Sequence, residues 1–188
     1  MKLNFWAFLY LSLIIITIQS CVLDNNTLTP TSQFTITFEK GPLAGQNIEL
    51  ISSNSSYDLQ FYTQKLSTKI SAQPLEEKSQ NSLSQSSSIN WAWLGDEVEG
   101  NFKASFFSDP NVNTSGDIEL SYKNNDYITC SIPKNAAITI NSYGNVGETV
   151  DGALNFIGVI DYNYNMINKR EPTMVTVKFS IVRGPDSN

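Results

Sequence analysis

The sequence predicts an all-β fold: a single antiparallel domain, either a sandwich or barrel-like, with about nine or ten strands. Three observations predict it. Apolar and polar residues alternate with a period of two along much of the chain, which is the pattern of half-buried strands. Clusters of Asn, Gly, Asp and Pro separate these runs, as turns between short strands do. No segment shows the period of a long helix, which disfavours a parallel sheet built from βαβ units.

The alternating runs follow one another in order, and each is defined by apolar residues that share one face of a strand. The shorter runs are Phe34/Ile36/Phe38, Ile48–Ile51, Tyr57/Leu59/Phe61, Ile89/Trp91/Trp93, Phe102/Ala104/Phe106, Ile118/Leu120/Tyr122, Ile128/Cys130/Ile132 and Ile138/Ile140. Two longer runs close the chain, Val150/Leu154/Phe156/Ile160 and Val175/Val177/Phe179/Ile181. Gly152 and Gly158 lie on the apolar face of the first long run. Because a glycine inside a strand often marks a bend, we expect that strand to curve.

Residues 64–88 break the alternation. Lys65–Lys78 has the composition of a short helix interrupted by Pro74, and Ser79–Ser88 is dominated by serine and glutamine. Such a segment buries too little apolar surface to offset the entropy lost on ordering. The sequence therefore predicts a mobile excursion near 64–88 within one β domain that spans residues 34–188.

The first residues predict an export signal over residues 1–20. A short basic start, Met1–Asn4, precedes the apolar run Phe5–Ile18, which is the order of a secretory signal. The run is too short to cross a bilayer as a mature helix, which needs about 20 apolar residues. Cleavage by the ordinary signal peptidase and an uncleaved anchor helix remain as alternatives.

The tetrad Ile18-Gln19-Ser20-Cys21 resembles the lipobox of bacterial lipoproteins, which has an aliphatic residue, a small residue and then cysteine. Gln19 departs from the small residue usual at its position. The resemblance implies a diacylglycerol on Cys21 and an acylated amino group, carrying chains such as palmitate, and therefore a firm membrane anchor. Val22 replaces the aspartate that retains some lipoproteins in the inner membrane, which favours the outer membrane. Residues 21–33 are polar and predict a flexible tether of at most about 40 Å.

Charge and composition exclude several classes of function. Without residues 1–20 the chain carries 11 basic and 18 acidic residues, a formal charge of −7, which argues against nucleic-acid partners. The chain contains no histidine, so Ser-His-Asp and Cys-His catalysts and histidine-containing zinc sites are excluded. With Cys21 committed to lipid, Cys130 has no disulfide partner and is expected to be a small buried hydrophobe. We expect neither an enzyme nor a cofactor.

The segment from Ile138 through Gly144-Asn145-Val146-Gly147 to the strand before Arg183 resembles the C-terminal half of small uncharacterised bacterial surface lipoproteins. In that family a strand, a Gly-x-x-Gly turn and two closing strands recur. The resemblance implies a β-rich fold and an envelope location, and it implies no activity.

One loop has the chemistry of a cation site. Asp109, Asn111, Asn113 and Asp117 place oxygen atoms at alternating positions, which suits Ca²⁺ and is how an EF-hand loop opens. However, Gly116 stands at the eighth position of the loop rather than the sixth, and Leu120 stands where a closing glutamate belongs. The alternative is a polar turn between two strands.

Two aromatic pairs are candidate binding residues. Trp91 and Trp93 share a strand face and, if exposed, would form a platform for a glycan or a protein; their alternative is the core, with Ile89. Tyr162 and Tyr164 lie in a polar setting that favours an exposed contact, and a hairpin tip is the competing explanation.

Two charged segments complete the candidates. Asp96, Glu97 and Glu99 beside the tryptophans have the composition of a glycosidase cleft, but a solvated acidic face is the commoner arrangement. Residues 169–172, Lys-Arg-Glu-Pro, are interpreted as a charged loop.

These observations together predict a non-enzymatic binding or adhesion module, lipid-anchored in a bacterial envelope, with a protein or a glycan as ligand. A structural envelope component and a carboxylate-based glycan hydrolase are the alternatives.

Overall fold

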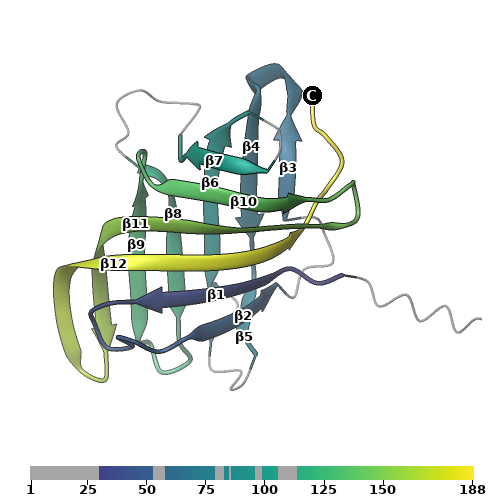
Figure 1. The fold of residues 1–188 in the computed structure, drawn as a ribbon. Helices are drawn as coiled ribbons and strands as arrows, with labels where there is room; N and C mark the ends of the chain where they lie inside the picture. The colour runs from purple at the N-terminus through teal and green to yellow at the C-terminus, as the bar shows by residue number, and fades with distance from the viewer. Residues whose placement is uncertain (1–29, 53–57, 79–82, 85, 96–98, 106–113) are drawn as a thin grey trace, which may run out of the picture.

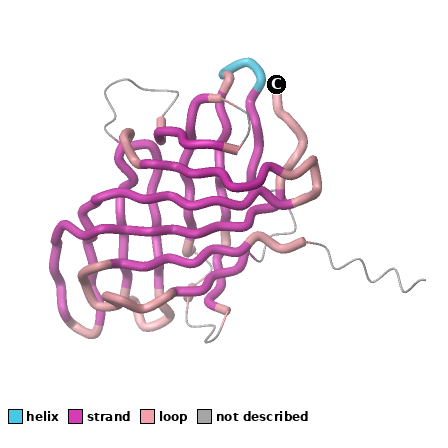
Figure 2. Tube along the Cα trace, viewed as in Figure 1, coloured by secondary structure: helices cyan, strands magenta, loops and turns pink. Residues whose placement is uncertain are grey.

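The computed structural model describes residues 30–52, 58–78, 83–84, 86–95, 99–105 and 114–188, and it confirms the all-β prediction. Twelve antiparallel strands form one sheet, and the one helical element in these ranges is a 3₁₀ turn at Thr63–Lys65 (Figure 2). The strands are β1 (Gln33–Phe38), β2 (Ile48–Ser52), β3 (Leu59–Tyr62), β4 (Ser67–Ala72), β5 (Leu75–Glu77), β6 (Ser88–Leu94), β7 (Gly100–Lys103), β8 (Thr114–Ser121), β9 (Tyr127–Pro133), β10 (Ala137–Tyr143), β11 (Thr149–Tyr164) and β12 (Ile167–Val182).

The sheet folds over itself into two layers (Figure 1). Its order is β3-β4-β6-β8-β9-β11-β12-β1-β2-β5, and β10 pairs with both β11 and β7. Strands β3, β4, β6, β8 and β9 form one layer, and β10, β11, β12, β1 and β2 run across it in the other. The sheet is not closed into a barrel, so the sandwich describes the fold better.

The long strand β11 joins the two layers at one corner. It pairs with β10 as far as Asn155 and with β9 from Ile160 onward. Gly158 lies in the interval between these partners, and a Cβ on it would come within 2.8 Å of the Cys130 sulfur. A side chain at this position would therefore collide with Cys130 and Phe156, so the close packing of the two layers here requires a glycine.

Residues 67–77 join the layers at the opposite corner, so the mobile excursion predicted near 64–88 does not hold for this part of the segment. β4 pairs with β6 in one layer, and β5 pairs with β2 in the other. Ile70, Ala72 and Leu75 are fully buried. The apolar runs are so short that neighbouring serines and glutamines conceal them in the sequence, and cross-strand pairing supplies the order that composition does not. Residues 79–82 and 85 lie outside the described ranges.

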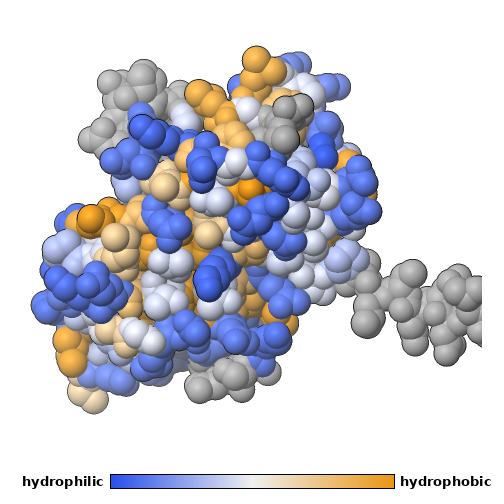
Figure 3. Space-filling view, viewed as in Figure 1, coloured by the Kyte–Doolittle hydropathy of each residue, from blue (hydrophilic) through white to orange (hydrophobic). Residues whose placement is uncertain are grey.

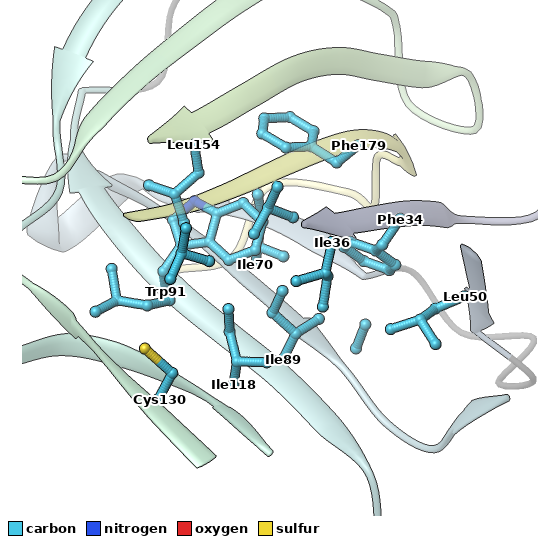
Figure 4. Close-up of a cluster of buried hydrophobic side chains, with 14 of the residues drawn as sticks. Phe34, Ile36, Leu50, Ile70, Ile89, Trp91, Ile118, Cys130, Leu154 and Phe179 are labelled. Atoms are coloured by element: carbon cyan, nitrogen blue, oxygen red, sulfur yellow. The ribbon is translucent and has the colours of Figure 1, made fainter. Parts of the chain in front are cut away.

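The core lies between the two layers and is one continuous cluster of alternating side chains (Figure 4). Trp91 from β6 packs on Phe179 from β12, with ring centroids 5.3 Å apart. Cys130 is buried among them, and burial raises the pKa of its thiol to about 12. The structure thus shows the small buried hydrophobe that the sequence predicted.

The predicted tether, residues 21–33, ends earlier than expected. Ser32 is buried, its carbonyl oxygen accepts the backbone N–H of Ser52 at 3.0 Å, and its hydroxyl accepts the N–H of Val182 at 3.0 Å. Gln33 is already the first residue of β1. The predicted signal, residues 1–20, and Cys21 lie outside the described residues. Among the residues that are described, no helix has the length and apolar composition needed to cross a membrane.

Candidate binding surface

Trp91 and Trp93 do not form a surface platform. Their side chains are 1% and 0% exposed, and Trp93 lies 6.4 Å from the ring of Phe102, centroid to centroid. The core alternative is therefore correct, because both indoles lie on the inner face of β6 with Ile89. A sugar could reach neither ring without separating the layers.

Tyr162 and Tyr164 lie at the inner side of the β11–β12 hairpin, and neither is the exposed contact expected. Tyr162 is buried, and its hydroxyl donates a hydrogen bond to Glu171 Oε1 at 2.9 Å. Tyr164, half-buried, meets the ring of Tyr122 edge to face at 5.3 Å. The competing explanation, a hairpin tip, is correct, because β11 ends at Tyr164 and the turn follows it.

The predicted calcium loop is divided by the structure. Asp117 lies inside strand β8, where its carboxylate accepts a hydrogen bond from the side chain of Asn90 on β6. Asp109, Asn111 and Asn113 lie outside the described residues, and among the residues that the structure does describe no three acidic or cysteine side chains form a metal-binding group. Asp117 was predicted to be a loop ligand because the neighbouring Gly116 is typical of a turn. Both residues instead lie within strand β8.

The charged segments also differ from expectation. Residues 169–172 are not a loop: they belong to β12 and pair with β11. Asp96 and Glu97 lie outside the described residues, and Glu99 is exposed just before β7.

The exposed apolar side chains gather on the β11–β12 hairpin. Eight large hydrophobic residues are exposed in the described part of the chain, and five of them belong to this hairpin: Ile157, Val159, Met166, Ile167 and Met174. Met166 and Met174 are also the chain's only methionines besides Met1. Methionine is adaptable in contact and is frequent at binding surfaces. An exposed apolar cluster of this kind is typical of an interaction site.

We call the outward-facing part of this cluster the outer patch: Ile157, Val159, Pro172 and Met174. The register places Ile157 opposite Met174 and Val159 opposite Pro172. The patch borders two shallow hollows, of about 350 Å³ and 200 Å³, which share Ile157 and Pro172. Figure 3 shows apolar surface where β11 and β12 bend and again toward the end of the hairpin.

The turn of the hairpin, Asn165–Met166, is held in a strained shape. Both residues have left-handed backbone angles, φ 51° and φ 65°. Two-residue turns of this type favour Asn-Gly, so a methionine at the second position costs about 1–2 kcal/mol. The Met166 side chain is nevertheless 98% exposed. Strain without any compensating burial indicates that this residue contributes something other than stability.

The inner side of the hairpin braces this turn. The Asn165 N–H donates to Asp126 Oδ2 at 3.1 Å, which ties the turn to the connection between β8 and β9. Lys169 Nζ donates to Glu171 Oε2 at 2.8 Å, beside the bond from Tyr162. These two hydrogen bonds, the one from Lys169 foremost, hold the pKa of Glu171 below its ordinary value, so the carboxylate stays charged. The exposed tip of the hairpin is therefore preorganised rather than flexible.

The sequence missed this surface, although it held a signal. Ile157 and Val159 alternate with the core residues Phe156 and Ile160, so β11 is apolar on both faces at this point. A strand that is apolar on both faces is either covered on both sides or exposes a hydrophobic surface.

Comparison with known protein families, curated proteins and solved structures finds no match to this chain. The exposed β11–β12 hairpin is therefore the feature of the molecule that suggests a function.

Proposed function

We propose that this protein is a lipid-anchored, non-enzymatic binding module of a bacterial envelope that presents the tip of its β11–β12 hairpin to a partner protein. The observation that carries the proposal is the exposure of Met166 and Ile167, 98% and 58%, on a strained but braced turn. Preorganised apolar contacts lose little entropy on binding, which makes them effective anchors.

The position of the tip supports presentation away from an anchor. β1 begins at one side of the domain and the tip lies at the other (Figure 1). Gln33, the first residue of β1, pairs with Ser180 of β12, which follows Met166 in the turn by fourteen residues. In a chain held through Cys21, the tip would lie on the side of the domain farther from the attachment of the tether.

A protein partner fits this surface better than a glycan. Sugars bind flat aromatic rings, and the tryptophans that were candidates for that role are buried. The side chains at the tip are aliphatic or sulfur-containing, which suits insertion into an apolar pocket on a protein.

The anchor is tested by mass. The wild-type chain from bacterial membranes is expected to begin at Cys21 and to carry acyl chains, whereas Cys21→Ala is expected to lose them and leave the membrane fraction. Acyl chains that persist on Cys21→Ala, or a mature protein that retains residues 1–20, would refute the anchor.

Partner binding is tested by photo-crosslinking in intact cells of the producing bacterium. A photoreactive residue at position 167 is expected to give a specific protein adduct. The matched control is position 119, an exposed glutamate on the outer face of β8 in the opposite layer. Equal adducts from both positions, or none from position 167, would contradict the proposal.

A further inference from the structure

The outer patch is separate from the hairpin tip, and nothing in the proposed partner binding uses it. We propose that the outer patch joins two copies of this chain into a symmetric dimer. The inference needs neither the lipid anchor nor the partner protein.

The centre of the patch is apolar and continuous. Ile157 and Pro172 each line both hollows, so the two hollows form one surface. Val159 borders one end of it and Met174 the other. Water on four neighbouring apolar side chains is displaced when a matching surface covers them, which favours association.

Charges of both signs flank this centre. Arg170 lines the first hollow, and Glu39 and Lys40 line the second. Asp161 stands opposite Arg170 across the strand pair. Among the described residues, none of these four side chains makes an ion pair, although three ion pairs form elsewhere. The surface therefore carries two cations and two anions, and the charge of Lys40 also helps to lower the pKa of Glu171.

The arrangement of these charges is self-complementary. The Glu39 N–H donates to the Met174 carbonyl at 3.0 Å, so Glu39 lies beside Met174. Arg170 lies four residues along β12 from Met174, about 13 Å away at 3.3 Å per residue. A two-fold axis that crosses the strands between Pro172 and Met174 carries Met174 of one copy onto Pro172 of the other, and it leaves Arg170 about two residues, roughly 7 Å along the strand, from the other copy's Glu39.

The same axis lays Val159 of one copy on Ile157 of the other and brings Arg170 of each toward Glu39 of its mate. A two-fold interface repeats every contact twice, so each charge pair counts double. An acidic partner would leave Glu39 and Asp161 facing like charges, and an anionic bilayer would face the same two carboxylates. A second copy satisfies both signs at once.

The size of the patch sets the expected strength. Twelve residues line the two hollows, against the roughly 20–30 on each side of a standard stable interface. We therefore expect a dissociation constant on the order of 10–500 μM in solution, and stronger association where both copies share a membrane, because confinement raises the effective concentration.

The test is sedimentation equilibrium of the mature chain carrying Cys21→Ala, at concentrations up to about 1 mM. Wild type is expected to form a dimer. Val159→Asp is expected to weaken association at least tenfold, because it places a charge in the apolar centre, and Arg170→Glu is expected to weaken it on the order of tenfold. Arg170→Glu combined with Glu39→Arg is expected to recover most of the loss. Lys178→Glu, an exposed position of β12 outside the patch, is the matched control and should leave the dimer intact.

Three results would overturn the proposal: a monomer at every concentration, a dimer that survives Val159→Asp, or a charge-swapped variant no stronger than either single variant. Thermal unfolding of each variant checks that the fold is intact. Vesicles of phosphatidylcholine and phosphatidylglycerol are the second arm, and binding that Val159→Asp abolishes would assign the patch to lipid instead. Substitutions at position 166 are expected to leave the dimer unchanged, so failure of the dimer and failure of partner binding can be told apart.

Discussion

Replacing Met166 by glycine is expected to make the protein more stable and, at the same time, to weaken its partner binding. The turn places residue 166 at φ 65°, a backbone conformation that glycine adopts freely and methionine does not. The Met166 side chain is 98% exposed, so its removal uncovers no buried apolar surface. Stability and binding should therefore change in opposite directions at this single position.

The size of the gain follows from two opposing effects. Relief of the left-handed backbone is worth about 1–2 kcal/mol. Glycine also gives the unfolded chain more freedom, which costs about 0.4–1 kcal/mol. The net stabilisation is about 0–1.6 kcal/mol and centred near 0.8 kcal/mol, which raises the melting temperature of a domain of this size by about 2–3 °C.

Thermal and urea unfolding of wild type, Met166→Gly and Met166→Ala measure this difference. Met166→Ala is the matched control, because it removes the side chain and keeps the strain, so its stability should remain near that of wild type. Both variants should lose the crosslinked adduct from position 167. A Met166→Gly protein that is less stable than wild type would refute the strain argument, and one that keeps full crosslinking would remove Met166 from the binding surface.

Other positions give independent tests. Gly116→Ala is expected to destabilise the fold by about 1–3 kcal/mol in urea unfolding, because its Cβ would lie 2.7 Å from the Trp91 Cα and closer still to a backbone oxygen of β6; Gly147→Ala, at a left-handed position with open space around it, should cost about 1 kcal/mol. Burial raises the pKa of Asp58 despite hydrogen bonds from Ser32 and Ser52, so the charged form is disfavoured in the folded protein and stability falls as pH rises through the unfolded and then the folded pKa. Asp58→Asn should therefore be more stable than wild type at pH 7 and equal to it near pH 3, and a difference that does not change with pH would contradict this. The Cys130 thiol, with its pKa raised to about 12, should resist a thiol reagent in native protein and react fully in denaturant; rapid labelling of native protein would show that the core opens there.

The fold was predictable wherever one face of a strand is buried and the other face is exposed to solvent. Each of the ten alternating runs overlaps a strand, because period-two alternation is imposed by the pleat itself. β4 and β5 escaped prediction, since Ile70, Ala72 and Leu75 are too few to form a visible run. Their position depends on β6 and β2, which are distant in sequence, and such pairing leaves no local pattern.

The candidate site was less predictable than the fold. Spacing placed Trp91 and Trp93 on one face correctly, and the core alternative for them was sound, but alternation does not say which face of a strand is outside. The outer patch depends on Ile157 and Met174 meeting across a strand pair and on both side chains staying exposed among the described residues. That second condition is a property of the assembled sheet. The unusual turn, by contrast, was visible in the sequence as Asn-Met in a place where Asn-Gly is usual.

The neighbours of β1 have a consequence for how the chain folds. β1 lies between β2 and β12, and the Ser32–Val182 hydrogen bond joins positions 150 residues apart. As the chain emerges from its N-terminus, β1 can pair with β2 alone, and its other edge stays open until β12 arrives. Contacts of such long range place folding in the slow, millisecond-to-second regime, with open strand edges exposed meanwhile. A chain cut short before β12 would therefore lose the pairing that completes its first strand as well as its last strand, and a chaperone that shields the open edge of β1 is expected to raise the yield of folded protein.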